Sequence, residues 1–136
     1  MKRFLLDSGI VNELAQRDPR IDEVIRAKKN QGAVIGTTPP VVGELWAGVE
    51  LSSSREKNEP RLRRALNRLT IWPYDVAAAE EFGRLRAVLR RIGRPMQQID
   101  IQIAAVALSL GNCTVVSTDS DLFAVPGLDV VNWVPS

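Results

Sequence analysis

Apolar residues fall into two alternating patterns along the chain, short continuous runs and longer stretches with helical spacing. The short runs predict strands, and they occupy 2–7, 33–38, 71–74, 112–118 and 128–133. Apolar residues three and four positions apart predict helices, and these stretches fill 8–16, 18–29, 41–54, 55–69, 75–93 and 99–111. Strands and helices therefore alternate along most of the chain.

The segment 99–111 differs from the other predicted helices because it has almost no polar face. A helix that is apolar all round lies in the middle of a fold. Continuously apolar strands alternating with helices indicate a parallel sheet covered on both faces. We therefore predict an α/β fold in three layers, with a central, mostly parallel β-sheet flanked by helices. At 136 residues the chain is expected to form a single domain, 1–136.

Four carboxylates stand at the ends of apolar runs or inside apolar helical patterns. Asp7 ends the first predicted strand, Asp119 follows the run 112–118, Asp100 opens the buried helix, and Glu44 lies beside an apolar helix face. Ligand sites in parallel sheets lie at the carboxyl ends of the strands, so Asp7 and Asp119 are expected at one edge. Converging carboxylates repel one another unless a cation joins them. This pattern predicts a Mg²⁺ or Mn²⁺ site and metal-assisted chemistry on a phosphate ester.

Each carboxylate also has a purely structural interpretation. Asp7 could cap the helix that follows its strand, and Glu44 could pair with an arginine on a helix surface. Asp100 could be a first-turn acid that the helix dipole favours. Asp119 and Asp121 lie in a turn-rich segment where aspartates commonly bond to their own backbone. Asp119 is nearer the strand end and ranks above Asp121 as a site residue.

The chain has no histidine and a single cysteine, Cys113. This composition excludes catalytic triads that need histidine, an internal disulfide, and zinc sites built from cysteine or histidine. A metal-activated water could replace the missing side-chain base. There is no phosphate-binding glycine loop and no apolar run long enough to span a membrane. A cytoplasmic location is therefore expected.

The formal net charge is only +2, but basic residues gather in two segments. One segment contains Arg55, Lys57, Arg61, Arg63, Arg64 and Arg68, and the other contains Arg84, Arg86, Arg90, Arg91 and Arg94. A basic rim around an acidic centre suits a polyanionic substrate. The alternative is that these residues form solvated helix faces with intrahelical ion pairs. Arg84, Arg86 and Arg90 are the candidates for contact with such a substrate.

Four segments in this order resemble the PIN-domain ribonucleases, specifically the VapC-type toxins of type II toxin–antitoxin systems. The segments are FLLDSGIVNEL, VVGELWAGVEL, IDIQIAAVAL and STDSDLFAVPGLDVVNW. The resemblance implies a PIN-like fold and assigns catalysis and metal binding to Asp7, Glu44, Asp100 and Asp119. It implies cleavage of RNA phosphodiester bonds by a Mg²⁺-dependent endoribonuclease, with Mn²⁺ as a substitute. It also implies a homodimer, a cognate VapB-type antitoxin, a heterotetramer or larger complex, and operator DNA bound only through the antitoxin.

The chain departs from the family pattern immediately after Asp7, where Ser8-Gly9 replaces the usual Thr-Asn. Ser8 retains a hydroxyl and, with Ser117 and Asp121, is a supporting site candidate. The loss of a side chain at Gly9 leaves an alternative function, a PIN-like binding module with little or no catalysis. A phosphotransfer domain with a reactive aspartate needs a lysine near a late strand. The chain has no lysine after Lys57, which argues against that third function.

Overall fold

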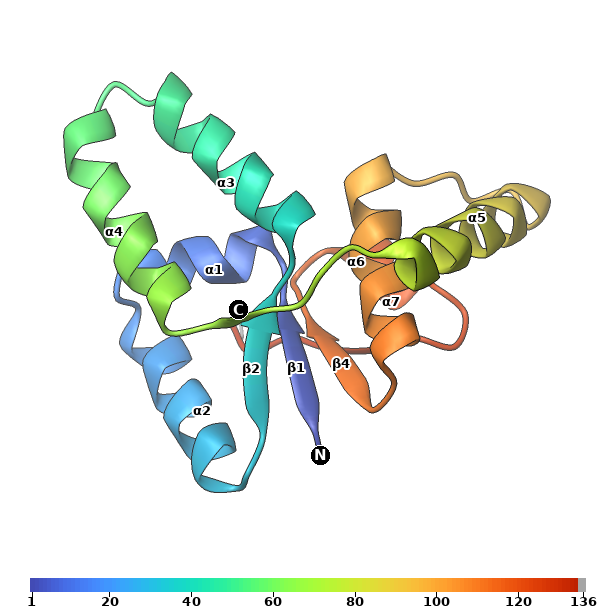
Figure 1. Ribbon diagram of the computed structural model, residues 1–136, viewed down its shortest axis with the longest axis horizontal. Helices are drawn as coiled ribbons and strands as arrows, with labels where there is room; N and C mark the ends of the chain where they lie inside the picture. Colours follow the sequence, from blue (N-terminus) through green and yellow to red (C-terminus); the bar gives the residue numbers. More distant parts are fainter. Residues whose placement is uncertain (135–136) are drawn as a thin grey trace.

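The protein is described by a computed structural model covering residues 1–134 (Figure 1). Five strands alternate with helices: β1 (Arg3–Leu6), β2 (Val34–Thr37), β3 (Thr70–Ile71), β4 (Cys113–Val116) and β5 (Asp129–Val131). The helices are α1 (Ser8–Ala15), α2 (Pro19–Asn30), α3 (Pro39–Leu51), α4 (Arg55–Asn67), α5 (Val76–Arg91), α6 (Gln98–Leu110) and α7 (Ser120–Phe123). The predicted alternation of strands and helices is confirmed.

All strand pairings in the sheet are parallel, and the strand order is β3-β2-β1-β4-β5. Strand β1 is central, with Leu5 opposite Gly36 of β2 on one side and Val115 of β4 on the other. Parallel strands expose their carboxyl ends at one edge of the sheet, and β1 and β4 deliver Asp7 and Ser117 there. The α/β fold with a parallel sheet flanked by helices is therefore confirmed.

The core joins the central strands to apolar residues of α1, α2, α4, α5 and α6. Strands β1 and β4 are buried almost throughout, and α6 buries six residues, Ile101 and 103–107. This burial confirms the prediction, made from the lack of a polar face, that the helix lies in the middle of the fold. Cys113 is also buried, as expected for a small apolar residue. Phe4 packs against Trp133 with ring centroids 5.1 Å apart, which joins β1 to the C-terminal segment.

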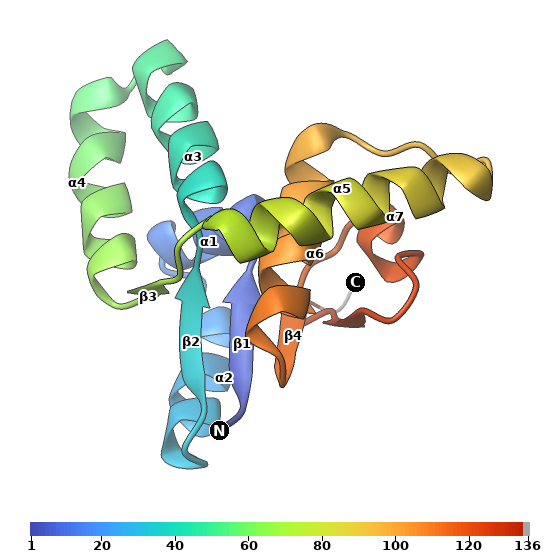
Figure 2. The same ribbon diagram turned by 45° about the vertical axis from the view of Figure 1, so that its right-hand side comes forward.

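Helices α3 and α4 form a pair that extends beyond the carboxyl edge of the sheet (Figure 1). Helix α3 continues from the end of β2, and α4 returns the chain to β3. Turning the molecule shows α5 crossing in front of α6, away from that pair (Figure 2). Helices from distant parts of the sequence thus surround the edge where Asp7 lies. No helix within residues 1–134 combines the length and apolar character needed to cross a membrane.

Two local features differ from the sequence prediction. Strand β3 spans only Thr70–Ile71, not 71–74, because Pro73 has no N–H for the ladder. The last bond to β2 is made by Trp72, whose N–H donates to the Thr37 carbonyl at 2.8 Å. The turn-rich segment after β4 contains the short helix α7, which the apolar pattern did not predict. As Pro73 suggested, β3 is an edge strand.

Candidate metal centre

Three aspartates converge beside the carboxyl edge of the sheet. One carboxylate oxygen each from Asp100, Asp119 and Asp121 lies within 4.8 Å of the other two. Asp100 comes from the first turn of α6, while Asp119 caps α7 and Asp121 lies in its first turn. All three side chains are half-buried. A compact set of oxygen donors on helix ends is chemically suited to a hard divalent cation such as Mg²⁺.

Asp7 has both roles that its sequence position allowed, a helix cap and a member of the acidic edge. It follows β1 directly, is 9% exposed, and accepts a 3.1 Å hydrogen bond from the Ile10 N–H at the start of α1. The N-cap of α1 is therefore Asp7 and not Ser8. Its other carboxylate oxygen accepts a short hydrogen bond from the Ser117 hydroxyl.

Ser117 connects two acidic segments that are far apart in the sequence. Its hydroxyl donates to Asp7 and accepts a 2.9 Å bond from the Asp119 N–H. The side chain is fully buried at the end of β4. With both contacts made, the hydroxyl fixes the position of Asp7 relative to the backbone of Asp119.

The acidic edge carries an excess of negative charge. Burial raises the pKa of Asp100 to about 6, and the nearby charges of Asp119, Asp121, Asp7 and Glu44 add to the shift. Burial also raises the pKa of Asp7, although its hydrogen bonds from Ser117 and Ile10 oppose the change. Carboxylates that raise one another's pKa bind a cation with a gain in electrostatic energy. These residues therefore fit the divalent cation that the sequence predicted.

Asp121 lies closer to the centre than its sequence rank suggested. The Asp119 carboxylate accepts a 2.9 Å bond from the Asp121 N–H, which is the local turn that the aspartate-rich segment predicted. That same turn brings the Asp121 carboxylate beside Asp119 and Asp100. Asp121 is also paired with Arg94 at 3.2 Å, a contact that sequence reasoning missed. Arg94 belongs to the second basic segment, but the pattern gave no sign of its partner.

Glu44 lies at the rim of the site, not within the group of three aspartates. It is exposed on α3 and lines a groove of about 450 Å³ between α1, α3 and α4, together with Ser8 and Gly9. Its charge raises the pKa values of Asp7 and Asp100, so it is close enough to act on them electrostatically. The groove opens directly beside the acidic edge.

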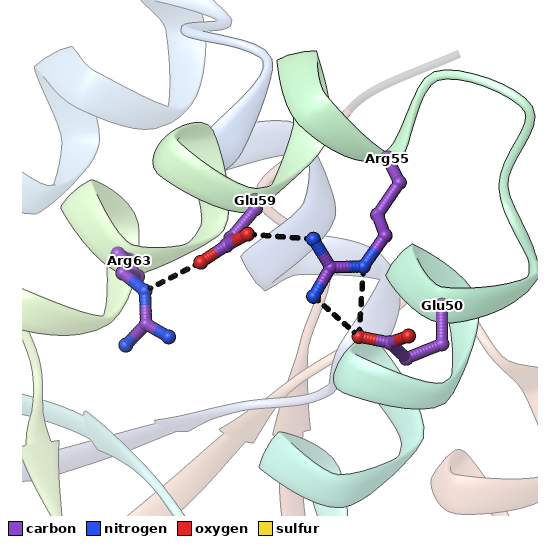
Figure 3. Close-up of polar contacts among 4 residues, drawn as sticks. All are labelled: Glu50, Arg55, Glu59 and Arg63. Atoms are coloured by element: carbon purple, nitrogen blue, oxygen red, sulfur yellow. Dashed lines mark hydrogen bonds and ion pairs between the residues drawn. The ribbon is translucent and has the colours of Figure 1, made fainter.

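The structure separates the arginines of α4 that are already paired from those that are not. Arg55 lies between Glu50 of α3 and Glu59, at 2.8 and 2.9 Å (Figure 3). Arg63 also pairs with Glu59, at 3.2 Å, and its guanidinium lies 4.8 Å from the centroid of the Trp46 ring. These contacts brace α3 against α4. For Arg55 and Arg63, the prediction of a surface ion-pair network is confirmed.

The arginines of α5 also differ from one another in their surroundings. Arg84 pairs with Glu81 one turn earlier, at 2.8 Å. Arg86 and Arg90 line a hollow of about 180 Å³ with Gln98 and Ile101, in the first turn of α6. None of the converging aspartates lines this hollow. Within residues 1–134 Arg86 and Arg90 form no ion pair, so their guanidinium groups are available to a ligand, whereas that of Arg84 is held by Glu81.

Comparison with known proteins identifies the class to which this fold and site belong. A model of the PIN domain matches residues 4–128, and the chain belongs to the PIN-domain family. "Ribonuclease VapC2" of Haemophilus influenzae is 33% identical over 134 residues, covering 98% of this chain and all of the relative. Within the PIN-domain family, the chain is therefore a VapC-type ribonuclease, the toxin of a toxin–antitoxin system.

Two further relatives agree over nearly the whole length. The "tRNA(fMet)-specific endonuclease VapC" of Shigella flexneri is 31% identical, covering 98% of this chain and 99% of the relative. The crystal structure of DNA-bound VapBC from Salmonella typhimurium superposes with a TM-score of 0.88 and 26% identity. That match covers 98% of this chain and 100% of the other. The resemblance drawn from the sequence is confirmed.

Proposed function

We propose that this VapC-type protein cleaves RNA endonucleolytically with Mg²⁺, for which Mn²⁺ can substitute. The observation that carries the proposal is the convergence of Asp100, Asp119 and Asp121, with Asp7 alongside and Glu44 at the rim. When bound, the ion would stabilise charge on the phosphoryl oxygens and lower the pKa of a water molecule, which could then lose a proton and attack the phosphodiester.

The side chains divide the work around that ion. Asp100, Asp119 and Asp121 present oxygens close to one another and would hold the ion directly. Asp7 is fixed by Ser117 and by the first turn of α1, so it can bind the ion or orient a water with little rearrangement. Glu44 lies on α3 at the rim of the site and would act on the ion through water, not as a direct ligand. Because the chain has no histidine, no imidazole can act as the general base in this site.

The substrate needs cationic contacts outside the metal centre, since phosphate contacts supply much of the affinity for nucleic acid. Arg86 and Arg90 adjoin the first turn of α6 and are our primary candidates for RNA phosphates. Arg84 is a secondary candidate, because its guanidinium is already held by Glu81. The Shigella relative is named for the initiator tRNA, and a structured RNA loop of that class is the first substrate to test.

We propose that a cognate VapB-type antitoxin inhibits the nuclease by covering the groove beside Glu44. Its apolar floor, formed by residues such as Leu45, Val49 and Leu62, suits a peptide segment. The Salmonella relative was crystallised as a VapBC complex on DNA, which supports operator binding through the antitoxin. A homodimer, assembling into a heterotetramer or larger complex in the cytoplasm, completes the proposal.

Cleavage of RNA by the purified, antitoxin-free protein tests the catalytic proposal. We expect cleavage that needs Mg²⁺ or Mn²⁺ and falls at least about 100-fold in D7N and D100N. Asp129→Asn, on the exposed edge strand β5, is the matched control and should cleave like the wild type. Equal cleavage by D7N and the wild type would refute the proposal. A wild type that neither cleaves RNA nor binds Mn²⁺ in a calorimeter would favour the binding-module alternative.

A further inference from the structure

A group of arginines lies on the face of α4 opposite the paired residues Arg55 and Arg63. Arg61, Arg64 and Arg68 follow one another at spacings of three and four residues, so they share one face of the helix. That face meets α1 and α2, because Arg61 donates to Gln16 at 3.1 Å and Arg68 pairs with Asp22. It is distinct from the face on which Arg55 and Arg63 are held by glutamates (Figure 3).

Three arginines enclose a hollow at the junction of α1, α2 and α4. Its volume is about 280 Å³, and its polar lining is Arg17, Arg64, Arg68 and a single carboxylate, Asp22. Arg17 directly follows the C-cap of α1 with φ +60°, a backbone conformation that costs a non-glycine residue about 1 kcal/mol or more. The chain therefore keeps an arginine at a position where glycine would be more stable.

The hollow has a clear excess of positive charge. Asp22 pairs with Arg68, whereas Arg17 and Arg64 form no ion pair within residues 1–134. Each guanidinium carries five N–H donors in a planar fork that matches two phosphate oxygens. A pocket with three such groups and one carboxylate is suited to a singly or doubly charged phosphate. It contains no apolar anchor comparable with the floor of the larger groove.

The hollow and the groove beside Glu44 are lined by neighbouring residues of α1 and α4. The 450 Å³ groove runs from Ser8 and Glu44 to Gln16 and Arg61, and the hollow begins beside it at Arg17 and Arg64. Helix α1 forms a wall of both. From Asp7 to Arg17 this path is about 15 Å, taking 1.5 Å per helical residue. A stacked single strand that rises about 3.4 Å per nucleotide covers this path in about four nucleotides.

We propose that Arg17, Arg64 and Arg68 bind a backbone phosphate of the RNA about four nucleotides from the scissile bond. This inference rests on the proposed RNA cleavage at the acidic site. The intervening groove supports RNA as the ligand, because Asn12 and Asn58 line it with amides that can bond to base edges. One donor of the Asn58 amide is already used by Ser52. An acidic peptide is the competing ligand, and the experiment below separates the two.

The test compares the wild type with the double variant R17Q/R64Q, which leaves the Arg68–Asp22 pair between α2 and α4 intact. R26Q/K57Q is the control because it removes the same charge from two exposed positions that do not line the hollow. Cleavage with Mn²⁺ is measured on an RNA of about twelve nucleotides and on one too short to reach the hollow, with about two nucleotides on each side. Anisotropy in EDTA measures binding of the longer RNA and of an oligoglutamate peptide.

For R17Q/R64Q we expect the KM of the long RNA to rise roughly tenfold, with kcat unchanged and the short RNA cleaved normally. Binding of the long RNA in EDTA should weaken similarly. The slope of the logarithm of its binding constant against the logarithm of salt concentration should become shallower by about 0.7. Unchanged affinity for the long RNA, an equal loss in R26Q/K57Q, or a larger loss for the peptide would overturn the inference. If the wild type cleaves neither RNA, the proposed function fails and the anisotropy data alone decide this site.

Discussion

The hydroxyl of Ser117 donates a hydrogen bond to the Asp7 carboxylate across 110 residues of sequence. Both groups are buried, one at the end of β4 and the other at the end of β1. Since the same hydroxyl accepts from the Asp119 N–H, a single oxygen atom aligns two acidic segments that the chain brings together only by folding.

Removing that hydroxyl with Ser117→Ala should affect both stability and metal binding. The buried Asp7 carboxylate and the partly buried Asp119 N–H each lose a hydrogen bond, which we expect to lower the free energy of unfolding by about 1–3 kcal/mol. The pKa of Asp7 should rise further, because the Ser117 bond lowers it. Mn²⁺ affinity by calorimetry should therefore weaken, and its pH profile should shift upward. S109A is the control, since it loses only a bond to the Val106 carbonyl; equal effects in both variants would contradict a role at the site.

Asp100→Asn should stabilise the metal-free protein while weakening metal binding. Burial raises the pKa of Asp100 in the folded protein from 3.8 to about 6. The contribution of this carboxyl group to folding stability is therefore fully present below pH 3.8 and is lost as pH rises through about 6. At pH 7 the wild type bears this destabilisation and D100N does not. The full shift would correspond to about 3 kcal/mol, and solvent screening of the partly exposed group reduces the expected gain to about 1 kcal/mol.

Thermal unfolding in EDTA at pH 4.5 and pH 7.5 provides the measurement for D100N. The variant should be more stable than the wild type at pH 7.5, with a smaller difference at pH 4.5. Mn²⁺ affinity of the wild type should itself fall below about pH 6, because binding then has to displace a proton from Asp100. A D100N protein that is less stable than the wild type at pH 7.5 would show that the acidic site is not electrostatically strained.

Gly36→Ala should strongly destabilise the fold, whereas Gly83→Ala should not. A Cβ at position 36 would lie 2.4 Å from the Thr70 carbonyl oxygen and 2.7 Å from the Trp72 ring, so β2 and β3 would have to separate. A Cβ at position 83, on the exposed face of α5, would meet nothing within 4 Å. We expect G36A to lose more than about 2 kcal/mol and G83A to gain roughly 0.5–1 kcal/mol. Urea unfolding of both variants gives the comparison.

Gly9→Asn introduces the asparagine that the family resemblance implies two positions after Asp7. A Cβ there would lie 3.6 Å from the nearest Asp7 carboxylate oxygen, an ordinary contact, so the substitution should fold without strain. We expect a gain of a few tenths of a kcal/mol from helix propensity. If the missing side chain limits catalysis, the rate of RNA cleavage should increase at constant Mn²⁺ affinity. An unchanged rate would mean that this chain's site does not depend on residue 9.

Much of the fold could be predicted because burial dictates the sequence pattern. The apolar runs of β1 and β4 and the apolar circumference of α6 required a covered parallel sheet. That sheet in turn placed Asp7 at its carboxyl edge. The pattern could not place Asp121, because the position of this residue depends on the four-residue helix α7. The direction of α7 is set by the hydrogen bond from the Asp121 N–H to the Asp119 carboxylate. Nor could it assign Arg94, which reaches Asp121 from another loop.

The arginines illustrate a second limit. Helical spacing predicts that Arg61, Arg64 and Arg68 share a face, but it does not say which neighbour that face meets. The docking of α4 against α1 and α2 decides this. The same docking leaves the alternate face to Arg55 and Arg63, whose partners on α3 and α4 neutralise them. The net charge of +2 gives no indication of this difference between the two faces of α4.

The position of β1 at the centre of the sheet has a consequence for the cell that makes this protein. Its partner β4 and the residues Ser117 and Asp119 are synthesised more than a hundred residues after Asp7. A ribosome that has completed α5 has therefore produced Asp7 and Glu44 but not the three aspartates that converge. As a result, the nascent chain cannot bring its acidic residues together until translation is almost finished.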